Sequence, residues 1–470
     1  MSEEEKREST PTFTATIRLK TPPKQVKHLL MLSDCARQLY NACLGEGIKR
    51  LHRLQHTTLY RETVQLPKTK KFKTQRSSQF KFLNETFGFK DLFNAFGIKT
   101  KNDSKFIVEH LGTHVCQKIA TRAFKAVQKV ALKQAKRVFF KSKGEFVSFE
   151  GKNNETFLTY SNGYVFIGDM TLKCLINPKD KWLQHALQHR VKFCRIISKI
   201  IKGNPHFYVQ LILEGYPYQK VKMGDETMGL DIGPSTIAMV SDTKAELKEF
   251  CKKVVKIDKE KRVIQRRLDR QRKANNPQHY NVNGTIKKGK KVWKNSKRYI
   301  KTKNELAEME RKLAETRKML HGWETNRVIE RANTVKLEKL SYIAFQKLYG
   351  KSVGRKAPSM FVKMLKRKMM AYGGTVQEFS TYSTKLSQTC LCGTIKKKRL
   401  KDRWHVCECG IHAQRDLFSA FLAKHVTKSH KLSLKEAKKE WDKIKPLLET
   451  CVSDLKEMKK ERKLISTFGV

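Results

Sequence analysis

The sequence places a carboxylate inside an apolar strand pattern at Asp231, and this feature limits the possible folds more than any other. In MGLDIGPSTIAMV (228–240), apolar residues alternate up to a Gly-Pro-Ser turn and a second apolar run follows, which predicts a β-hairpin. A charge near the end of a buried strand is costly to desolvate unless it is paired, protonated or bound to a cation. The simpler alternative is a turn-forming aspartate beside Gly233.

The chain is strongly basic along its whole length. Its 470 residues include 100 Lys and Arg against 44 Asp and Glu, a formal net charge of +56, so a polyanion is the natural partner. The length predicts two to four domains. No run approaches about 18 uninterrupted apolar residues, and the acidic opening MSEEEKRE is unlike a signal peptide. We therefore expect a soluble protein of the prokaryotic cytoplasm with no membrane partner.

The first half of the chain shows a strand, then helices, then short strands. Alternation over 13–19 predicts a half-buried strand, and helical spacing predicts one helix over 25–44 and a second, long one near 105–137. Between them, the basic and aromatic residues 66–82 predict an exposed loop on nucleic acid. Short strand patterns from about 140 to Gly215 predict a β-rich module that the first strand joins from a distance.

The second predicted helix carries a cationic face. A solvated surface explains this face, but we favour contact with a phosphate backbone. The face consists of Arg122, Lys125, Lys129, Lys133 and Lys136.

The second half of the chain follows an α/β pattern. A basic helix over 259–273 is predicted to lie against phosphates, and a long helix with an apolar face that includes Leu320 and Trp323 ends near Asn333. A strand over 334–340, a helix over 359–372 and a strand over 375–380 follow. The last segment, 433–465, is predicted to be helical and interrupted by Pro446.

Two more carboxylates stand in positions like that of Asp231. Glu338 ends the predicted strand 334–340, and Asp416 lies at a helix start. Sequence spacing does not show whether the three acids converge, but converging carboxylates would repel one another and attract a cation. Hard oxygen ligands suit Mg²⁺ or Mn²⁺. Two Mg²⁺ ions would activate a water and stabilise the leaving oxygen of a phosphodiester.

Four of the eleven cysteines fall within twenty residues, while the other seven are scattered. Reduced cysteines with one metal site fit this distribution better than a disulfide framework. Two Cys-x-Cys pairs complete a tetrahedral, structural Zn²⁺ site. The alternatives are that His405 or His412 replaces one sulfur, or that no metal binds. The cluster consists of Cys390, Cys392, Cys407 and Cys409.

Three segments together resemble RuvC-type nucleases of the TnpB family, which are RNA-guided DNA endonucleases encoded by small transposons. They are MGLDIGPSTIAMV, TVKLEKLSY and STKLSQTCLCGTIKKKRLKDRWHVCECGIHAQRDLFSAFLA. The resemblance extends to APSMFVKMLKRKM and to the helix around Tyr40-Asn41, so it spans nearly the whole chain. It implies that Asp231, Glu338 and Asp416 are the RuvC acids that hold Mg²⁺. Relatives usually carry Cys-x-x-Cys pairs, and many have an acidic residue in place of Gln414.

The resemblance also implies a multidomain α/β fold. In it, a β-barrel-like wedge domain is interrupted by a helical recognition lobe, and a RuvC (RNase H-like) nuclease domain carries a zinc-bearing insertion that binds target nucleic acid. The implied boundaries are 1–25 and 140–222 for the wedge domain, 26–139 for the recognition lobe, 223–389 and 411–470 for the nuclease, and 390–410 for the insertion.

The implied partners are a transposon-derived guide RNA and double-stranded target DNA flanked by a short motif. The implied cofactors are a pair of Mg²⁺ ions and a structural Zn²⁺. Two alternatives stay open. A compact type V CRISPR effector shares the chemistry but uses a repeat-derived guide. A non-catalytic RNA- or DNA-binding zinc protein of ribosomal type explains the charge and the cysteines, but it does not need the three acids in their motifs.

Overall fold

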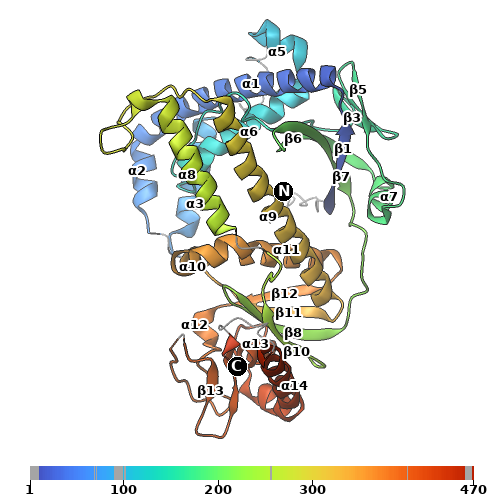
Figure 1. Cartoon of the computed structure of the whole chain (residues 1–470), viewed down its shortest axis with the longest axis vertical. Helices are drawn as coiled ribbons and strands as arrows, with labels where there is room; N and C mark the ends of the chain where they lie inside the picture. Colours follow the sequence, from blue (N-terminus) through green and yellow to red (C-terminus); the bar gives the residue numbers. More distant parts are fainter. Residues whose placement is uncertain are drawn as a thin grey trace, which may run out of the picture. The chain divides into compact units, whose positions relative to one another are not determined.

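The structure is a computed structural model in which the chain divides into two compact units after Tyr218 (Figure 1). The finer domain boundaries stay predictions. None of the helices in the described part of the chain is long and apolar enough to cross a membrane. The described residues are 10–67, 69, 71–88, 99, 102–254, 257–399, 401–460 and 468–469.

The first unit contains a seven-stranded sheet with the order β2-β6-β7-β1-β5-β4-β3, in which neighbours are antiparallel. The first strand of the chain pairs with β5 and β7, so the prediction that it joins the β-module from a distance is confirmed. Its alternation buries Ala15, Ile17 and Leu19. The strands are β1 (Thr12–Lys20), β2 (Ser148–Glu150), β3 (Leu158–Ser161), β4 (Tyr164–Ile167), β5 (Met170–Cys174), β6 (Val191–Ile201) and β7 (Asn204–Glu214).

This sheet nearly closes on itself, because β3 also lies against β6. The Asn154 side chain joins the two strands. Its amide accepts from the Tyr160 N–H at 2.8 Å and donates to the Tyr160 carbonyl at 3.1 Å, and the Cys194 thiol of β6 donates to it at 3.2 Å. The result is the β-rich module that the short strands predicted, in the barrel-like form that the resemblance implied.

The helices of the first unit pack around α1 and α6, and Leu32 and Leu39 are buried on the packed face of α1, which covers the helix predicted over 25–44. The prediction of one long helix over 105–137 is wrong, because the chain turns at Gly112, where an added Cβ would lie 2.6 Å from the Phe157 ring. The helix after this turn ends at Ala131. The helices are α1 (Pro23–His56), α2 (Thr58–Gln65), α3 (Lys73–Thr86), α5 (Lys105–His110), α6 (Thr113–Ala131) and α7 (Lys181–Leu187).

The prediction of an exposed loop over 66–82 is also wrong, because α3 begins at Lys73. One side of this helix packs: Leu83 is buried, and the Phe80 ring lies 6.4 Å from the Tyr60 ring, centre to centre. Phe82 stays exposed. Phe80 and Leu83 are three residues apart and lie on one face of a helix, and the packing of this face favours a helix over the exposed loop that the basic composition predicted. Residues 68 and 70 lie outside the described part of the chain.

The second unit is built on a five-stranded sheet with the order β10-β9-β8-β11-β12. The antiparallel pairing of β8 with β9 confirms the hairpin around Asp231, and β11 and β12 run parallel to β8. The strands are β8 (Glu226–Ile232), β9 (Thr236–Val240), β10 (Ala245–Glu249), β11 (Ala332–Glu338) and β12 (Thr375–Phe379).

Helices cover both faces of this sheet (Figure 1). α13 and α14 pack on one face, and α11 with the end of α9 packs on the other. The remaining elements are α8 (Asp258–Asn275), the 3₁₀ turn Pro277–His279, α9 (Lys297–Ile329), α10 (Tyr342–Lys356), α11 (Pro358–Ala371), α12 (Thr381–Thr384), β13 (Trp404–Val406), β14 (His412–Gln414), α13 (Arg415–Lys424) and α14 (Leu434–Lys460).

Two predicted details of these helices are wrong. Trp323 is exposed and stacks under the Arg327 guanidinium, because the buried face of α9 runs through Thr325 and Val328 instead. Pro446 does not interrupt α14, since it lies on the exposed side, where water can satisfy the carbonyl that loses its N–H partner. Residues 461–465 of the predicted last helix lie outside the described part of the chain.

Candidate active site and cysteine cluster

Parallel pairing of β8 and β11 brings Asp231 beside Glu338. Leu337 is in register with Leu230, so the next residue on each strand is one of the two acids. In-register side chains on neighbouring parallel strands point to the same face. The two carboxylates therefore share one face at the ends of their strands.

Asp416 reaches the same face through the close approach of α13 to Gly229. A Cβ added at Gly229 would lie 1.9 Å from the Ala420 carbonyl oxygen, so only glycine permits this contact. Gly229 precedes Asp231 by two strand residues, and Asp416 precedes Ala420 by one helical turn. Both steps measure about 6 Å, and the charge of Asp416 acts on Asp231, so the two carboxylates lie near one another.

The first turn of α13 supports a negative charge at Asp416, because helix N-termini favour carboxylates. Gln414 caps this helix. Its side-chain oxygen accepts from the Leu417 N–H at 2.8 Å, and its amide nitrogen donates to the Phe468 carbonyl at 3.2 Å. The glutamine that stands where many relatives of the resembled family have an acid thus has a structural role in this chain.

The environment of the site perturbs Asp231 and Glu338. Burial raises the pKa of Asp231 well above its usual value, and the charges of Asp416 and Glu338 raise it further, while Arg415 and Arg403 oppose the shift. Burial also raises the pKa of Glu338 to about 7. Neighbouring carboxylates with raised pKa values are an environment that a cation would relieve.

Two arginines that the sequence analysis missed hold Asp416. Arg415 donates two hydrogen bonds of 3.2 Å to one carboxylate oxygen, and the Arg403 guanidinium lies 3.6 Å from the other. Arg415 is itself anchored, since it donates to the Asp402 carbonyl at 2.7 Å. The available signal was the arginine directly before the third acid. Arginine also binds phosphate groups in a two-pronged way, so these side chains suit a site for phosphodiesters.

The three acids do not themselves form a compact ligand set. Among the described residues, one group of three or more metal-ligating side chains lies close enough to share an ion, and it is the four cysteines. Asp416 is instead paired with arginines. The predicted acids therefore share one face of the sheet without forming a closed ligand set, and the Mg²⁺ site stays a prediction.

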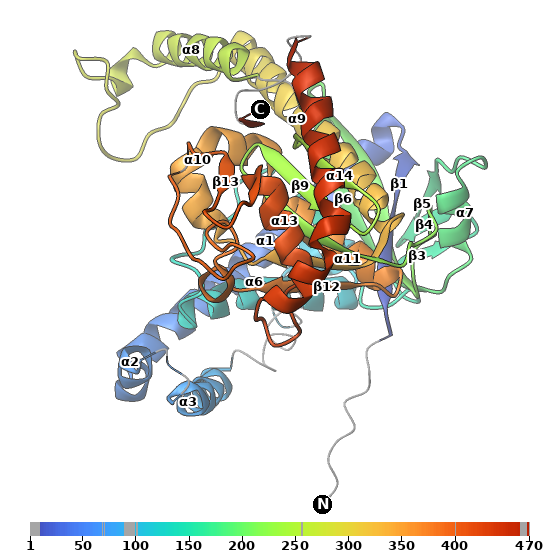
Figure 2. The ribbon, with the colours of Figure 1, turned by 90° about the horizontal axis from the view of Figure 1, so that it is seen from below.

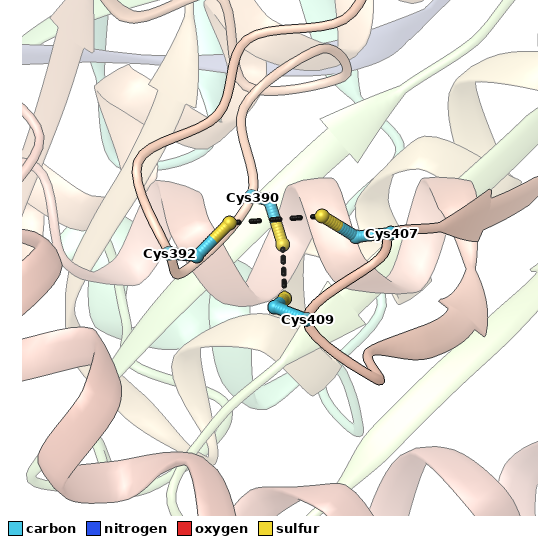
Figure 3. Close-up of side chains that lie close together, drawn as sticks. All are labelled: Cys390, Cys392, Cys407 and Cys409. Carbon is cyan, nitrogen blue, oxygen red and sulfur yellow. Dashed lines mark hydrogen bonds between the residues drawn. The ribbon is translucent and has the colours of Figure 1, made fainter.

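The four cysteine sulfurs converge from two loops (Figure 3) and lie within 4.8 Å of one another. Sulfur–sulfur distances are 3.5 Å for Cys390 and Cys409 and 3.6 Å for Cys392 and Cys407. A disulfide needs about 2.05 Å. A tetrahedral ion with Zn–S bonds of about 2.3 Å separates its sulfurs by about 3.8 Å. The donor set and its spacing fit structural zinc.

Both Cys-x-Cys pairs sit in the same kind of turn. In each turn the following glycine, Gly393 or Gly410, has φ above +89° and donates its N–H to the carbonyl of the first cysteine at 3.0 Å. The N–H of that cysteine donates to the residue four positions later, at 2.9 Å and 3.0 Å respectively. A Cys-x-Cys-Gly sequence therefore makes two equivalent loops that aim their thiols inward.

Neither histidine replaces a sulfur. His405 is buried against the Phe418 ring and pairs with Lys398, while the His412 ring lies on Trp404. The group of possible metal ligands contains the four thiols alone. The Thr394 hydroxyl, 3.2 Å from the Cys392 sulfur, lowers the pKa of that thiol to about 6, which favours the thiolate that a metal binds.

A basic groove of about 820 Å³ lies in the first unit, between α6 and strands β2 and β6. Three members of the predicted cationic face, Arg122, Lys125 and Lys129, line it. Lys133 instead lies over the Tyr60 ring. The carboxylate in the groove, Glu150, is neutralised by Arg195. The positive charge of the groove suits a phosphate backbone, and contact of the groove with a phosphate backbone stays a prediction.

Comparisons with known proteins bear on one part of the chain. Residues 359–422, which include the four cysteines and Asp416, match the model of the Cas12f1-like TNB domain. No curated protein matches the chain. A cryo-EM Cas12f1–sgRNA–target DNA complex matches with 10% identity and a TM-score of 0.40, covering 87% of this chain and 98% of that one. A CRISPR–Cas12f ternary complex matches with 11% identity and a TM-score of 0.29, covering 87% and 83%. These TM-scores are too low for a shared fold to follow.

Proposed function

We propose that the chain is an RNA-guided DNA endonuclease whose RuvC-type active site consists of Asp231, Glu338 and Asp416. The observation that carries this proposal is the position of three carboxylates from β8, β11 and α13 on one sheet face, one of which, Asp416, lies within the segment that matches the Cas12f1-like TNB domain. Buried acids with raised pKa values, such as Asp231 and Glu338, are typical of catalytic sites, which supports an enzyme over a binding-only protein.

The carboxylate set fits Mg²⁺, because hard oxygen ligands and mutual repulsion both favour a divalent cation. Asp231, Glu338 and Asp416 would hold the ions, which when bound would activate water and stabilise the leaving oxygen of the phosphodiester. Arg415 and Arg403 fix the orientation of Asp416. The basic groove of the first unit binds the RNA backbone, and structural zinc holds the loops before α13.

The guide is proposed to be an RNA transcribed beside the gene, within a transposable element, in line with the resemblance to the TnpB family. The CRISPR alternative differs in the source of this RNA. Sequencing the RNA that co-purifies with the protein distinguishes the two, because repeat-derived guides join one repeat sequence to many different spacers.

The test uses that RNA, reprogrammed to a plasmid target, with Mg²⁺. Wild-type protein should cut the matching plasmid, Asp231→Ala should bind it without cutting, and Asp225→Ala should cut normally. Asp225 is the matched control because it is exposed and only six residues away. Specific RNA and DNA binding without any cleavage by the wild type would support the non-catalytic alternative instead.

A further inference from the structure

The connection between α8 and α9 is a feature that the proposed chemistry does not use. From Arg270 to Asn304, both included, the sequence holds twelve Lys and Arg and no Asp or Glu. α8 and α9 lie side by side, joined by ion pairs such as Lys261 with Glu310. Figure 2 shows the connection leaving the end of α8 and returning to α9. We call residues 277–293 of this connection the finger.

The finger is a built hairpin. Tyr280 pairs with Ile286 in an antiparallel bridge. The Asn281 N–H donates to the Thr285 carbonyl at 2.8 Å, and the Gly284 N–H donates to the Asn281 carbonyl at 2.9 Å. Gly284 has φ of +80°, as the last position of a three-residue hairpin turn requires. These bonds define one conformation for the tip.

Two sets of contacts, an aromatic cluster and a set of side-chain hydrogen bonds, fix the base of the finger. The Trp293 ring packs against the Arg272 guanidinium and the His279 and Tyr280 rings, at 5.2 to 6.0 Å.

The second set of contacts is made by the side chain of Asn276, which is fully buried. Its amide donates to the Arg272 and Lys294 carbonyls at 2.9 and 3.0 Å and accepts from the Lys294 N–H at 2.7 Å. An aromatic cluster and a side-chain clamp thus hold the finger at a set angle on the two helices.

The tip combines an exposed apolar side chain with unpaired positive charge. Val282, at the turn, is completely exposed. None of the finger lysines forms an ion pair with a carboxylate in the described part of the chain. These lysines are Lys287, Lys288, Lys290 and Lys291. A rigid ribbon with a bare apolar tip and uncompensated lysines is suited to a polyanion with a groove.

We propose that the finger inserts into the major groove of B-form duplex DNA, with its lysines on the phosphates and Val282 against base edges. The B-DNA major groove is about 12 Å wide and admits a two-stranded β-ribbon, where thymine methyl groups offer an apolar contact. The A-form major groove is too narrow for side chains to read. The inference deepens the proposed function and rests on it for the choice of DNA as the partner.

The test measures binding without cleavage. Full-length protein, freed of RNA and kept in EDTA, is titrated with a fluorescent DNA duplex, and separately with double-stranded RNA of the same sequence. Changing the four finger lysines to Ala should weaken DNA binding about tenfold or more and reduce the log–log salt slope by about 3 to 4, since each phosphate contact contributes about 0.9. In the otherwise wild-type protein, Val282→Asp should also weaken DNA binding, whereas Val282→Ile should retain the wild-type affinity.

The matched control changes four exposed α14 lysines, Lys435, Lys438, Lys443 and Lys456, to Ala, which alters the net charge equally. It should leave the salt slope unchanged. Equal effects of the two quadruple variants, or a finger variant that loses more affinity for double-stranded RNA than for DNA, would overturn the inference. If the finger variants bind DNA normally while Asp231→Ala still abolishes cleavage, the finger inference fails and the proposed function stands.

Discussion

Gly229 of β8 touches Ala420 of α13 so closely that a Cβ on Gly229 would lie 1.9 Å from the Ala420 carbonyl oxygen. This contact sets the height of α13 above the sheet. Because Asp231 and Asp416 lie equal distances from it along the strand and the helix, the contact also sets the separation of two proposed catalytic carboxylates.

Gly229→Ala should therefore lower the free energy of unfolding by at least about 3 kcal/mol and abolish cleavage. The clashing atom is the Ala420 backbone oxygen, which cannot change rotamer to relieve the overlap as a side chain can. Urea unfolding and a plasmid assay measure the two effects. Gly354→Ala is the control. It lies in α10 with no atom within 4 Å of an added Cβ, and should stabilise the protein by about 0.5 to 1 kcal/mol. Normal stability of Gly229→Ala would show that α13 does not depend on this contact.

Alternation of apolar and polar residues predicted the strands around Asp231 and Glu338 well, because each strand of this sheet repeats its pattern within a few residues. Helix boundaries were predicted less well. The break at Gly112 depends on Phe157, and the helix at Lys73 depends on Tyr60. Partners distant in sequence leave no periodic signal in the segment that they shape.

In the Cys407→Ser variant, the zinc content of the purified protein and the rate of DNA cleavage should both fall. Cys409 lies seven residues before Asp416, so a loosened turn disturbs the start of α13, while RNA binding by the first unit should survive. Elemental analysis, RNA binding and cleavage report the three effects. Cys251 lies outside the cluster, so the Cys251→Ala variant should bind as much zinc as the wild type. Wild-type protein that lacks zinc when purified under reducing conditions would contradict the four-sulfur site.

Glu338→Gln should stabilise the metal-free protein at pH 8 and have little effect at pH 4. The folded pKa of Glu338, about 7, exceeds its usual 4.5, so its favourable contribution is present below about 4.5 and is lost as pH rises through 7. A gain of about 1 to 3 kcal/mol in EDTA is expected. Thermal melts should also show a Mg²⁺ stabilisation of the wild type that grows from pH 6 to pH 8. Stabilisation that shrinks over this range would argue against metal binding at Glu338.

Glu246→Gln should destabilise the second unit by about 2 kcal/mol at pH 7. Glu246 of β10 accepts from Arg327 at 2.8 Å and from Arg331 at 3.1 Å. Although burial opposes the shift, Lys248, Lys244 and these arginines lower its pKa to about 2.

The depressed pKa gives this difference a pH dependence of known sign. The stabilisation by Glu246 is present above its unfolded pKa of about 4.5 and is lost as pH falls towards 2. Urea unfolding at pH 7 and pH 4 should therefore show a smaller difference at the lower pH. Glu436→Gln breaks an exposed pair with Lys439 and should cost less than about 0.5 kcal/mol. Equal effects of the two substitutions would refute a special role for Glu246.

Sequence motifs select candidate members of the site but not their arrangement. The motif resemblance selected Asp231, Glu338 and Asp416, yet their convergence depends on the register of β11 with β8 and on the Gly229 contact, which no local pattern encodes. Arg403 was invisible for the same reason. It reaches Asp416 across the β13–β14 hairpin, whose pairing only the folded chain reveals.

The three carboxylates are proposed to act as one metal-dependent site for DNA cleavage. The decisive measurement is single-turnover cleavage of matched target DNA by Asp231→Asn, Glu338→Gln and Asp416→Asn, each loaded with guide RNA and Mg²⁺. Each variant should bind the target like the wild type and cleave it at least about 1,000-fold more slowly, and a double variant should be no slower than the slowest single one, because residues that act as a unit are not additive. A variant of any of the three that cleaves at the wild-type rate would contradict the claim.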